Sequence, residues 1–208
     1  YLFLFFAVLT LKLLAIFSTN FDLFGDEAQY WLWSKDLDYG YYSKPPLLAW
    51  IVGFFTFFAG NSFYAIKLIP FFVYLLSSYV IYLLVLELYN DKKLAAITSI
   101  SFYFIPVVTV SSFLLSTDVI LIFFWSLSLL FLLRAIKSPL IINFLMLGIF
   151  LGLGFLSKYA AIYFLLSLII LILFDCNTKK IFFKNLTNLA VFVFSFLLVL
   201  LPNIIWNS

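Results

Sequence analysis

The sequence contains no histidine, and its single cysteine is Cys176. The absence of histidine removes the usual zinc ligand and the usual proton shuttle at neutral pH, so acid–base chemistry falls to carboxylates, lysines or tyrosines. One cysteine excludes a disulfide framework within the chain and a thiolate metal site. The chemistry of this chain must therefore be sought among its few charged residues.

Charged residues make up 10% of the chain and give a net charge of +3. No basic run is long enough to follow a phosphate backbone, so we expect no nucleic-acid partner. Glycine-rich phosphate loops are also absent. We expect no cofactor and no nucleotide-activated donor; the sequence leaves open a divalent ion held jointly by Asp26, Glu27 and Asp118.

Hydrophobic residues, by contrast, make up 66% of the chain, and the mean hydropathy is +1.21. A soluble domain is nearer half apolar and a quarter charged, so this composition predicts a polytopic membrane protein. A hydrocarbon core of about 30 Å needs roughly 20 apolar residues per helix. The runs that qualify are residues 1–18, 66–88, 93–111, 117–136, 140–174 and 185–205.

The run 140–174 is too long for one helix, and Gly152, Gly154, Ser157 and Lys158 interrupt its middle. Dividing it there predicts an all-α polytopic bundle of about seven transmembrane helices.

Both ends of the sequence lie at apolar runs. The chain begins without methionine, so we expect residues 1–208 to be the N-terminal transmembrane region of a longer protein. A cleaved signal peptide is the alternative for the first run, and the absence of a small-residue cleavage site before Asn20 argues against it.

Residues 19–65 are expected to form an extracytoplasmic first loop with short interfacial helices. Within it, the stretch 45–59 is apolar but short and begins with two prolines, which suits a helix lying at the membrane surface. Short loops rich in lysine and arginine face the cytoplasm. The loops on the other side hold Lys92, Lys93, Arg134, Lys137, Lys179, Lys180 and Lys184. The first loop therefore faces outward.

Acidic residues concentrate in this loop, which holds five of the nine in the chain: Asp22, Asp26, Glu27, Asp36 and Asp38. In so apolar a sequence, this cluster indicates a wet surface used for chemistry or recognition. Asp26 and Glu27 begin a segment that predicts a short amphipathic helix, with Tyr30, Trp31 and Trp33 at headgroup depth.

A second carboxylate must come from elsewhere, because neighbouring residues on a helix point about 100° apart and cannot form a facing pair. Asp118, at the head of the run 117–136, is the candidate. For Asp26 and Asp118 alike, the alternative is a helix N-cap that accepts backbone N–H bonds.

Three lysines are candidates for binding an anion. Lys44 precedes two prolines that hold the backbone extended, and Lys158 interrupts more than thirty apolar residues. The alternatives are an interfacial lysine that touches lipid phosphates for Lys44 and a snorkelling anchor for Lys158. Lys67 suits either role and is left unassigned.

These motifs occur in an order that resembles a known enzyme family: Asp26-Glu27-Ala28-Gln29-Tyr30, Tyr42-Ser43-Lys44-Pro45-Pro46, Ser116-Thr117-Asp118, Gly152 to Lys158, and Pro202 to Asn207. The chain is similar to the C-type membrane glycosyltransferases, in the protein O-mannosyltransferase-like family that includes bacterial lipid A aminoarabinose transferases. The similarity covers nearly the whole chain. Aminoarabinose transferases usually have glutamate where this chain has Ser43, which points to another branch of the family.

The resemblance implies a site and its partners. Asp26 is then the catalytic acidic residue and Asp118 the second functional carboxylate, while Lys44 and Lys158 bind the lipid phosphate or the substrate. Glu27 and Tyr30, in the same motif as Asp26, are expected to bind substrate. The partners would be a polyprenyl-phosphate-linked sugar, a lipid or protein acceptor, and membrane lipids. The resemblance also implies an integral protein of the bacterial inner membrane whose active site faces outward.

The chemistry follows from the donor. A polyprenyl phosphate leaves as a stable anion, so it needs cations such as Lys44 and Lys158 rather than a protonating acid. Asp26 would take the proton of the acceptor, and a single direct displacement would invert the anomeric centre. The alternatives are a transporter or flippase of lipid-linked sugars, which would show mid-membrane charges and inverted repeats, and a purely structural membrane subunit.

Overall fold

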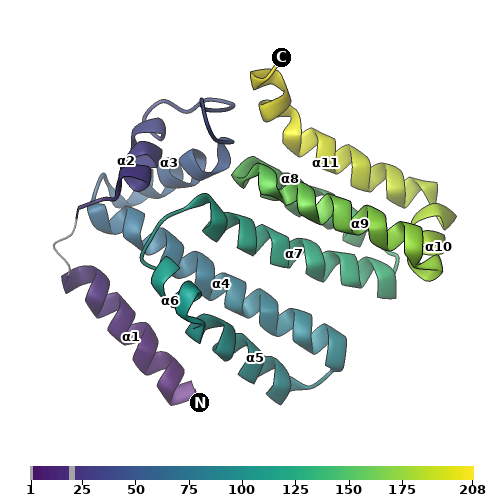
Figure 1. Cartoon of the computed structure of the whole chain (residues 1–208), viewed down its shortest axis with the longest axis horizontal. Coiled ribbons are helices and arrows are strands. Elements are labelled where there is room, and N and C mark those ends of the chain that lie inside the picture. The colour runs from purple at the N-terminus through teal and green to yellow at the C-terminus, as the bar shows by residue number, and fades with distance from the viewer. Residues whose placement is uncertain (1, 19–21) are drawn as a thin grey trace. The chain divides into compact units, whose positions relative to one another are not determined.

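The computed structural model describes residues 2–18 and 22–208, and these residues form helices and no strand (Figure 1). The chain divides into two compact units, Tyr1–Leu37 with Leu48–Ile120 and Asp38–Leu47 with Leu121–Ser208. The all-α prediction is confirmed. The loop predicted at 19–65 begins with three residues, 19–21, that lie outside the described part of the chain.

The helices of the first unit are α1 (Leu2–Ser18), α2 (Gly25–Trp33), α3 (Leu47–Ala59), α4 (Phe63–Tyr89), α5 (Lys92–Phe104) and α6 (Pro106–Ser111). Helix α7 (Thr117–Lys137) begins in the first unit and continues into the second. The second unit continues with α8 (Ile141–Ser157), a 3₁₀ turn (Tyr159–Ala161), α9 (Ile162–Phe174), α10 (Cys176–Lys184) and α11 (Leu186–Trp206).

Each run predicted to span the membrane coincides with helix, but a count of seven spans is not confirmed. Among the described residues, α4, α7 and α11 are long and apolar enough to cross a membrane. Helices α9 and α10 would supply a fourth span if they are taken together, although they are bent by 102° at their junction. Phe5–Ser18 of α1 and the whole of α3 and α8 are apolar but shorter.

Two breaks show how single residues divide the apolar runs. The run 140–174 is divided at Lys158, which is extended (φ −159°, ψ 134°) between α8 and the 3₁₀ turn, as predicted. The run 93–111 is not one helix, because α5 ends at Phe104 and Pro106 begins α6. Proline lacks a backbone N–H and disfavours helical backbone in the residue before it, and Ile105 accordingly has ψ 129°.

In the first unit, α4 and α5 lie side by side and antiparallel (Figure 1). Asn90, in the left-handed region with φ 52°, ends α4, and the carboxylate of Asp91 accepts the N–H groups of Lys93 and Leu94 to begin α5. Midway along the pair, the hydroxyl of Ser78 donates to the Ser99 carbonyl at 2.8 Å and that of Ser99 donates to the Ser78 carbonyl at 2.7 Å. Such polar contacts join helices that have little other polarity.

In the second unit, α8 and α11 approach each other closely (Figure 1). A methyl group at Gly148 would meet the carbonyl oxygen of Phe192 at 2.5 Å, and one at Gly152 would meet Cβ of Val199 at 2.8 Å. The two glycines are four residues apart on one face of α8, where small residues allow helix backbones to approach. Both helices also contribute to a core of buried apolar side chains, among them Phe144 of α8, Phe192 of α11 and Phe182 of α10.

Candidate active site

Helix α2 carries the acidic motif, and its predicted existence is confirmed. The helix begins at Gly25 with Phe24 in the N-cap position, so the alternative of Asp26 as the N-cap is wrong. Asp26 lies in the first turn and is exposed, whereas Glu27 is buried, with 1% of its surface accessible. The two acids therefore face different surroundings, as the 100° rotation between neighbouring helix residues requires.

The buried face of α2 also includes Tyr30 and ends at Ser34, spaced three and seven residues beyond Glu27. This spacing is that of one face of a helix. Tyr30 is 1% exposed and its ring lies 6.0 Å from that of Trp33. The ring of Tyr30 is therefore enclosed by protein; its depth in the membrane and its binding of substrate stay predictions.

The carboxylate of Glu27 accepts three hydrogen bonds from three parts of the chain. One oxygen accepts the backbone N–H of Phe24 at 3.0 Å and the ammonium of Lys67 at 2.5 Å. The other accepts the backbone N–H of Leu115 at 2.8 Å. A buried carboxylate needs this degree of compensation, since burial of an unpaired charge is strongly unfavourable.

Lys67 lies in the second turn of α4 and is 6% exposed. Besides its ion pair with Glu27, its ammonium donates to the carbonyl of Phe113 at 3.2 Å. It also lies 4.9 Å from the ring of Phe24 and 5.5 Å from that of Phe63, within cation–π range. Sequence reasoning left Lys67 unassigned. The signal was a cation inside an apolar run, which requires a counter-charge from another segment.

Asp118 lies at the start of α7. The helix begins at Thr117, so Asp118 is inside the first turn, and its alternative role as an N-cap is wrong. It is exposed, and Tyr74 of α4 has its hydroxyl hydrogen-bonded to the side chain of Ser111. Leu115, which donates to Glu27, lies three residues before Asp118. The structure thus brings together the segments that carry the two predicted catalytic aspartates.

The second unit contains the two lysines predicted to bind phosphate. Lys44 closes a tight turn, in which the backbones of Tyr41 and Lys44 exchange two hydrogen bonds of 3.2 Å. Tyr42, at the tip of this turn, is fully exposed. Gly40, just before the turn, lies so close to the indole of Trp206 that a methyl group there would collide with the ring.

Lys158 is half-buried at the break between α8 and α9. Its neighbour Tyr159 accepts a hydrogen bond of 3.1 Å from the side-chain amide of Asn203. Asn203 and Trp206 both lie in the final turns of α11, so these turns contact the segments of both Lys44 and Lys158. The motif at 202–207 therefore contacts the segments next to both lysines within the second unit.

The family described as dolichyl-phosphate-mannose-protein mannosyltransferase matches residues 43–206. The chain belongs to this family. It is a family of membrane glycosyltransferases of the C type, so the resemblance stated from the motifs is confirmed.

Two curated relatives from Rhizobium johnstonii carry transferase names. The lipid A galacturonosyltransferase RgtD is 34% identical over 96% of this chain and 42% of its own length. The lipopolysaccharide core galacturonosyltransferase RgtB is 30% identical over 91% of this chain and 38% of its own length. The chain thus spans about two-fifths of the length of these relatives. No solved structure matches it.

Family membership and the apolar helices together show that this chain is part of an integral membrane protein. Neither the family nor its named members support the transporter alternative. Among residues 2–18 and 22–208, no group of three histidine, cysteine, aspartate or glutamate residues is arranged to hold a metal ion. The joint ion site of Asp26, Glu27 and Asp118 that the sequence left open is therefore not seen.

Proposed function

We propose that the protein transfers a sugar from a polyprenyl-phosphate carrier to the lipid A or core part of lipopolysaccharide. The observation that carries this proposal is the arrangement at the start of α2 in a chain of this family. Asp26 is exposed, and its neighbour Glu27 is bonded to the segment that leads into Asp118. An exposed carboxylate on an anchored helix end is suited to accept a proton from an incoming hydroxyl group.

The reaction would proceed as one displacement. The acceptor hydroxyl oxygen attacks the anomeric carbon and loses its proton to the Asp26 carboxylate. The bond between the anomeric carbon and the phosphate oxygen breaks, and the polyprenyl monophosphate departs with the electron pair. Lys44 and Lys158 would stabilise the charge on the departing phosphate. Attack opposite the leaving group inverts the anomeric centre.

The names of the relatives favour particular substrates. Both are galacturonosyltransferases, one acting on lipid A and one on the lipopolysaccharide core. A galacturonosyl group on a polyprenyl phosphate is therefore the donor to test first. Ser43, in place of the glutamate usual in aminoarabinose transferases, is consistent with a different sugar.

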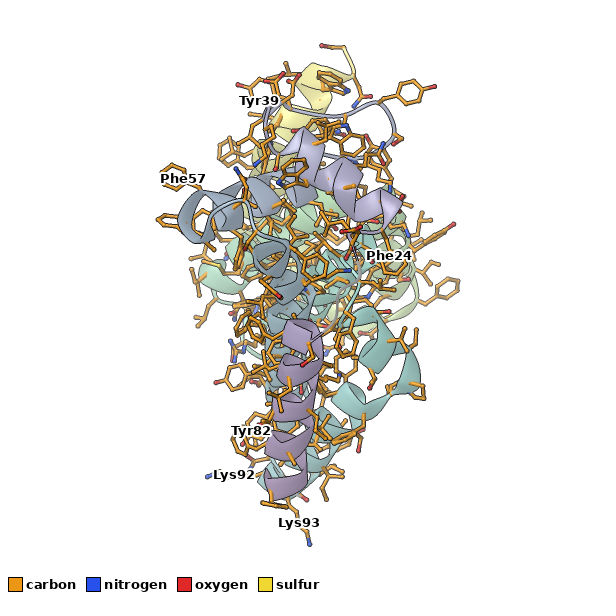
Figure 2. The ribbon with its side chains drawn as sticks, turned by 90° about the vertical axis from the view of Figure 1, so that its left-hand side faces the viewer. Phe24, Tyr39, Phe57, Tyr82, Lys92 and Lys93 are labelled. Atoms are coloured by element: carbon orange, nitrogen blue, oxygen red, sulfur yellow. The ribbon has the colours of Figure 1, made fainter. Side chains whose placement is uncertain are left out.

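The distribution of charge in the first unit supports an outward-facing site in the bacterial inner membrane. Lys67 pairs with Glu27 near the start of α4, whereas Lys92 and Lys93 follow its far end. At 1.5 Å per residue, the part of α4 from Lys67 to Tyr89 is roughly 33 Å long, which is about the thickness of the hydrocarbon core. Figure 2 shows Lys92 and Lys93 at an end of this unit remote from Phe24. Since short basic loops face the cytoplasm, the acidic motif would face the opposite side.

The experiment uses the complete protein in lipid vesicles with radiolabelled polyprenyl-phosphate galacturonic acid and lipid A. We expect label to appear in lipid A, with release of polyprenyl phosphate. Movement of intact donor across the vesicle without cleavage of the sugar–phosphate bond would instead indicate a flippase and contradict the proposal.

A further inference from the structure

The Glu27–Lys67 pair joins three segments that are far apart in sequence. Lys67 is 40 residues from Glu27, and Leu115 is 88 residues from it. The contacts therefore tie α2 to α4 and to the connection between α6 and α7. Tyr74, seven residues after Lys67 and hence on the same face of α4, bonds to Ser111 at the other side of this connection.

This pair is not well placed to bind a substrate. Glu27 and Lys67 are 1% and 6% exposed. Both carboxylate oxygens already accept hydrogen bonds from the chain, and two of the three ammonium protons of Lys67 are taken by Glu27 and the Phe113 carbonyl. A ligand would have to displace contacts that hold the backbone in place.

The pair is also a poor means of adding stability. Burying two charges removes their hydration, and their mutual attraction offsets this loss only when the geometry is good. Apolar pairs of similar volume often stabilise a protein as well or better. The hydrogen bonds of this ion pair are directional, whereas the contacts of an apolar pair are not. Each hydrogen bond fixes a particular backbone group relative to α2 and α4.

We infer that Glu27 and Lys67 are positioning residues that fix the distance between Asp26 and Asp118. Asp26 adjoins Glu27, and Asp118 follows Leu115 by three residues, so the pair anchors the two segments that carry these aspartates. The functional meaning of this spacing rests on the proposed transferase activity, in which Asp26 is the base. The spacing itself does not depend on that activity and is measured separately.

The first test measures the spacing without any substrate. The complete protein in nanodiscs carries spin labels at Asp26→Cys and Asp118→Cys, after Cys176→Ser and the replacement of any cysteine outside residues 1–208. Positions 26 and 118 are exposed in the native chain. Pulsed electron paramagnetic resonance should give a narrow distribution of distances between the two spin labels. Adding Lys67→Met should broaden it, because the Phe113 carbonyl and the Glu27 carboxylate each lose a donor. Lys93→Met, an exposed lysine at the far end of α4, is the matched control and should leave it narrow.

Lys67→Met leaves a buried carboxylate without its cation and could prevent folding. The double variant Glu27→Gln with Lys67→Met removes both charges while it keeps the side-chain volumes, so it should fold and still broaden the distribution. Lys67→Arg retains the charge and the donors and should restore a narrow distribution. A distribution that stays as narrow in the double variant as in the parent would overturn the inference.

The second test asks whether the spacing matters for transfer. The double variant, with both native aspartates present, should lower kcat roughly 10- to 100-fold, the range expected for a displacement of about 1 Å. KM for the donor should stay within about twofold, because neither residue binds it. A large rise in KM with unchanged kcat would contradict a positioning role and assign Glu27 or Lys67 to the substrate. If the native protein shows no transfer at all, the proposed function fails while the distance measurement still decides the inference.

Discussion

Asp26 and Glu27 are adjacent acids with opposite surroundings. Glu27 is enclosed and bonded to Phe24, Lys67 and Leu115, whereas Asp26 is exposed on the same turn. A charge held in place by its neighbours is suited to positioning, and an accessible one is suited to proton transfer. This contrast supports the proposal that the two neighbouring acids have different functions.

Asp26→Asn should abolish transfer while leaving the fold intact. Loss of a general base typically lowers the rate by about 10²- to 10⁴-fold. Loss of a carboxylate in the first turn of a helix lowers stability by at most about 1 kcal/mol. Turnover of radiolabelled donor and thermal unfolding check the two statements. Asp22→Asn, an exposed acid in the same segment, is the control and should keep full activity.

Equal turnover by the Asp26→Asn protein and the native protein would remove Asp26 from the mechanism. The same loss of activity in both the Asp26 and Asp22 variants would show a general requirement for negative charge in this segment rather than a base at one position.

At the scale of single residues, the sequence provided acidic candidates but not their partners. The concentration of acids in one loop led to Asp26 and Glu27, and the need for a second carboxylate led to Asp118 at the head of the run 117–136. Lys67 was missed as a partner because the pairing joins residues 40 positions apart, and no local pattern reports such a distance. Tyr30 was expected at headgroup depth because aromatic residues are common there, and the sequence did not show that its ring would be enclosed by protein on the buried face of α2.

At the scale of helices, the breaks were predictable where the responsible residue is unusual for its surroundings. Lys158 within an apolar run divides α8 from α9 as expected. Pro106 divides α5 from α6, a break that the same reasoning should have found from the proline alone. The contact of α8 with α11 was not predictable, because glycines in an apolar helix do not show which partner helix they approach.

Gly148→Ala should weaken the contact between α8 and α11. The added methyl group would lie 2.5 Å from the backbone carbonyl oxygen of Phe192, which cannot turn aside as a side chain can. Overpacking of this kind costs about 1–3 kcal/mol. Gly154→Ala is the matched control on the same helix, since its nearest neighbour would be 3.7 Å away. There, alanine should be neutral or stabilise by up to about 1 kcal/mol. Thermal unfolding checks both, and equal destabilisation by the two substitutions would contradict the close approach at Gly148.

Helix α10 should lose its N-cap at low pH. The Asp175 carboxylate accepts hydrogen bonds from the hydroxyl and the backbone N–H of Thr178, and these hold the pKa of this carboxyl below its ordinary value. Because the folded pKa is lowered, the contribution of the cap is complete above the ordinary value of about 4 and is lost as the pH falls through the lowered one.

Amide hydrogen exchange at residues 176–179 measures this loss. Asp175→Asn provides a cap that does not titrate. In this variant, the amides of residues 176–179 should keep their protection at low pH, once the pH dependence of the intrinsic exchange rate is taken into account. If the native protein and the Asp175→Asn protein lose protection in parallel, titration of Asp175 is not the cause.

At the scale of the whole molecule, the account requires the acidic motif and the basic segments to lie on opposite sides of the membrane. Two cysteine positions test this. Cys176, the cysteine within residues 1–208, is exposed at the start of the basic helix α10, and any cysteine elsewhere in the complete protein is replaced by serine. Tyr42, fully exposed at the tip of the Lys44 turn, is replaced by Tyr42→Cys in a Cys176→Ser background.

A membrane-impermeant maleimide applied to intact spheroplasts should label the protein at position 42 and should reach Cys176 only after lysis. Labelling of Cys176 from outside, with position 42 protected, would reverse the orientation and place the acidic motif in the cytoplasm.

The central claim is that the protein transfers a sugar to lipid A or core, and the mass of lipopolysaccharide tests it most directly. The host is a bacterium that produces polyprenyl-phosphate galacturonic acid but lacks galacturonosyltransferases of its own. Expression of the complete native protein should add the mass of one hexuronic acid residue to lipid A or to the attached core, and expression of the Asp26→Asn protein should add nothing. Lipopolysaccharide of unchanged mass in the presence of the folded native protein, or an equal gain with the Asp26→Asn protein, would contradict the account.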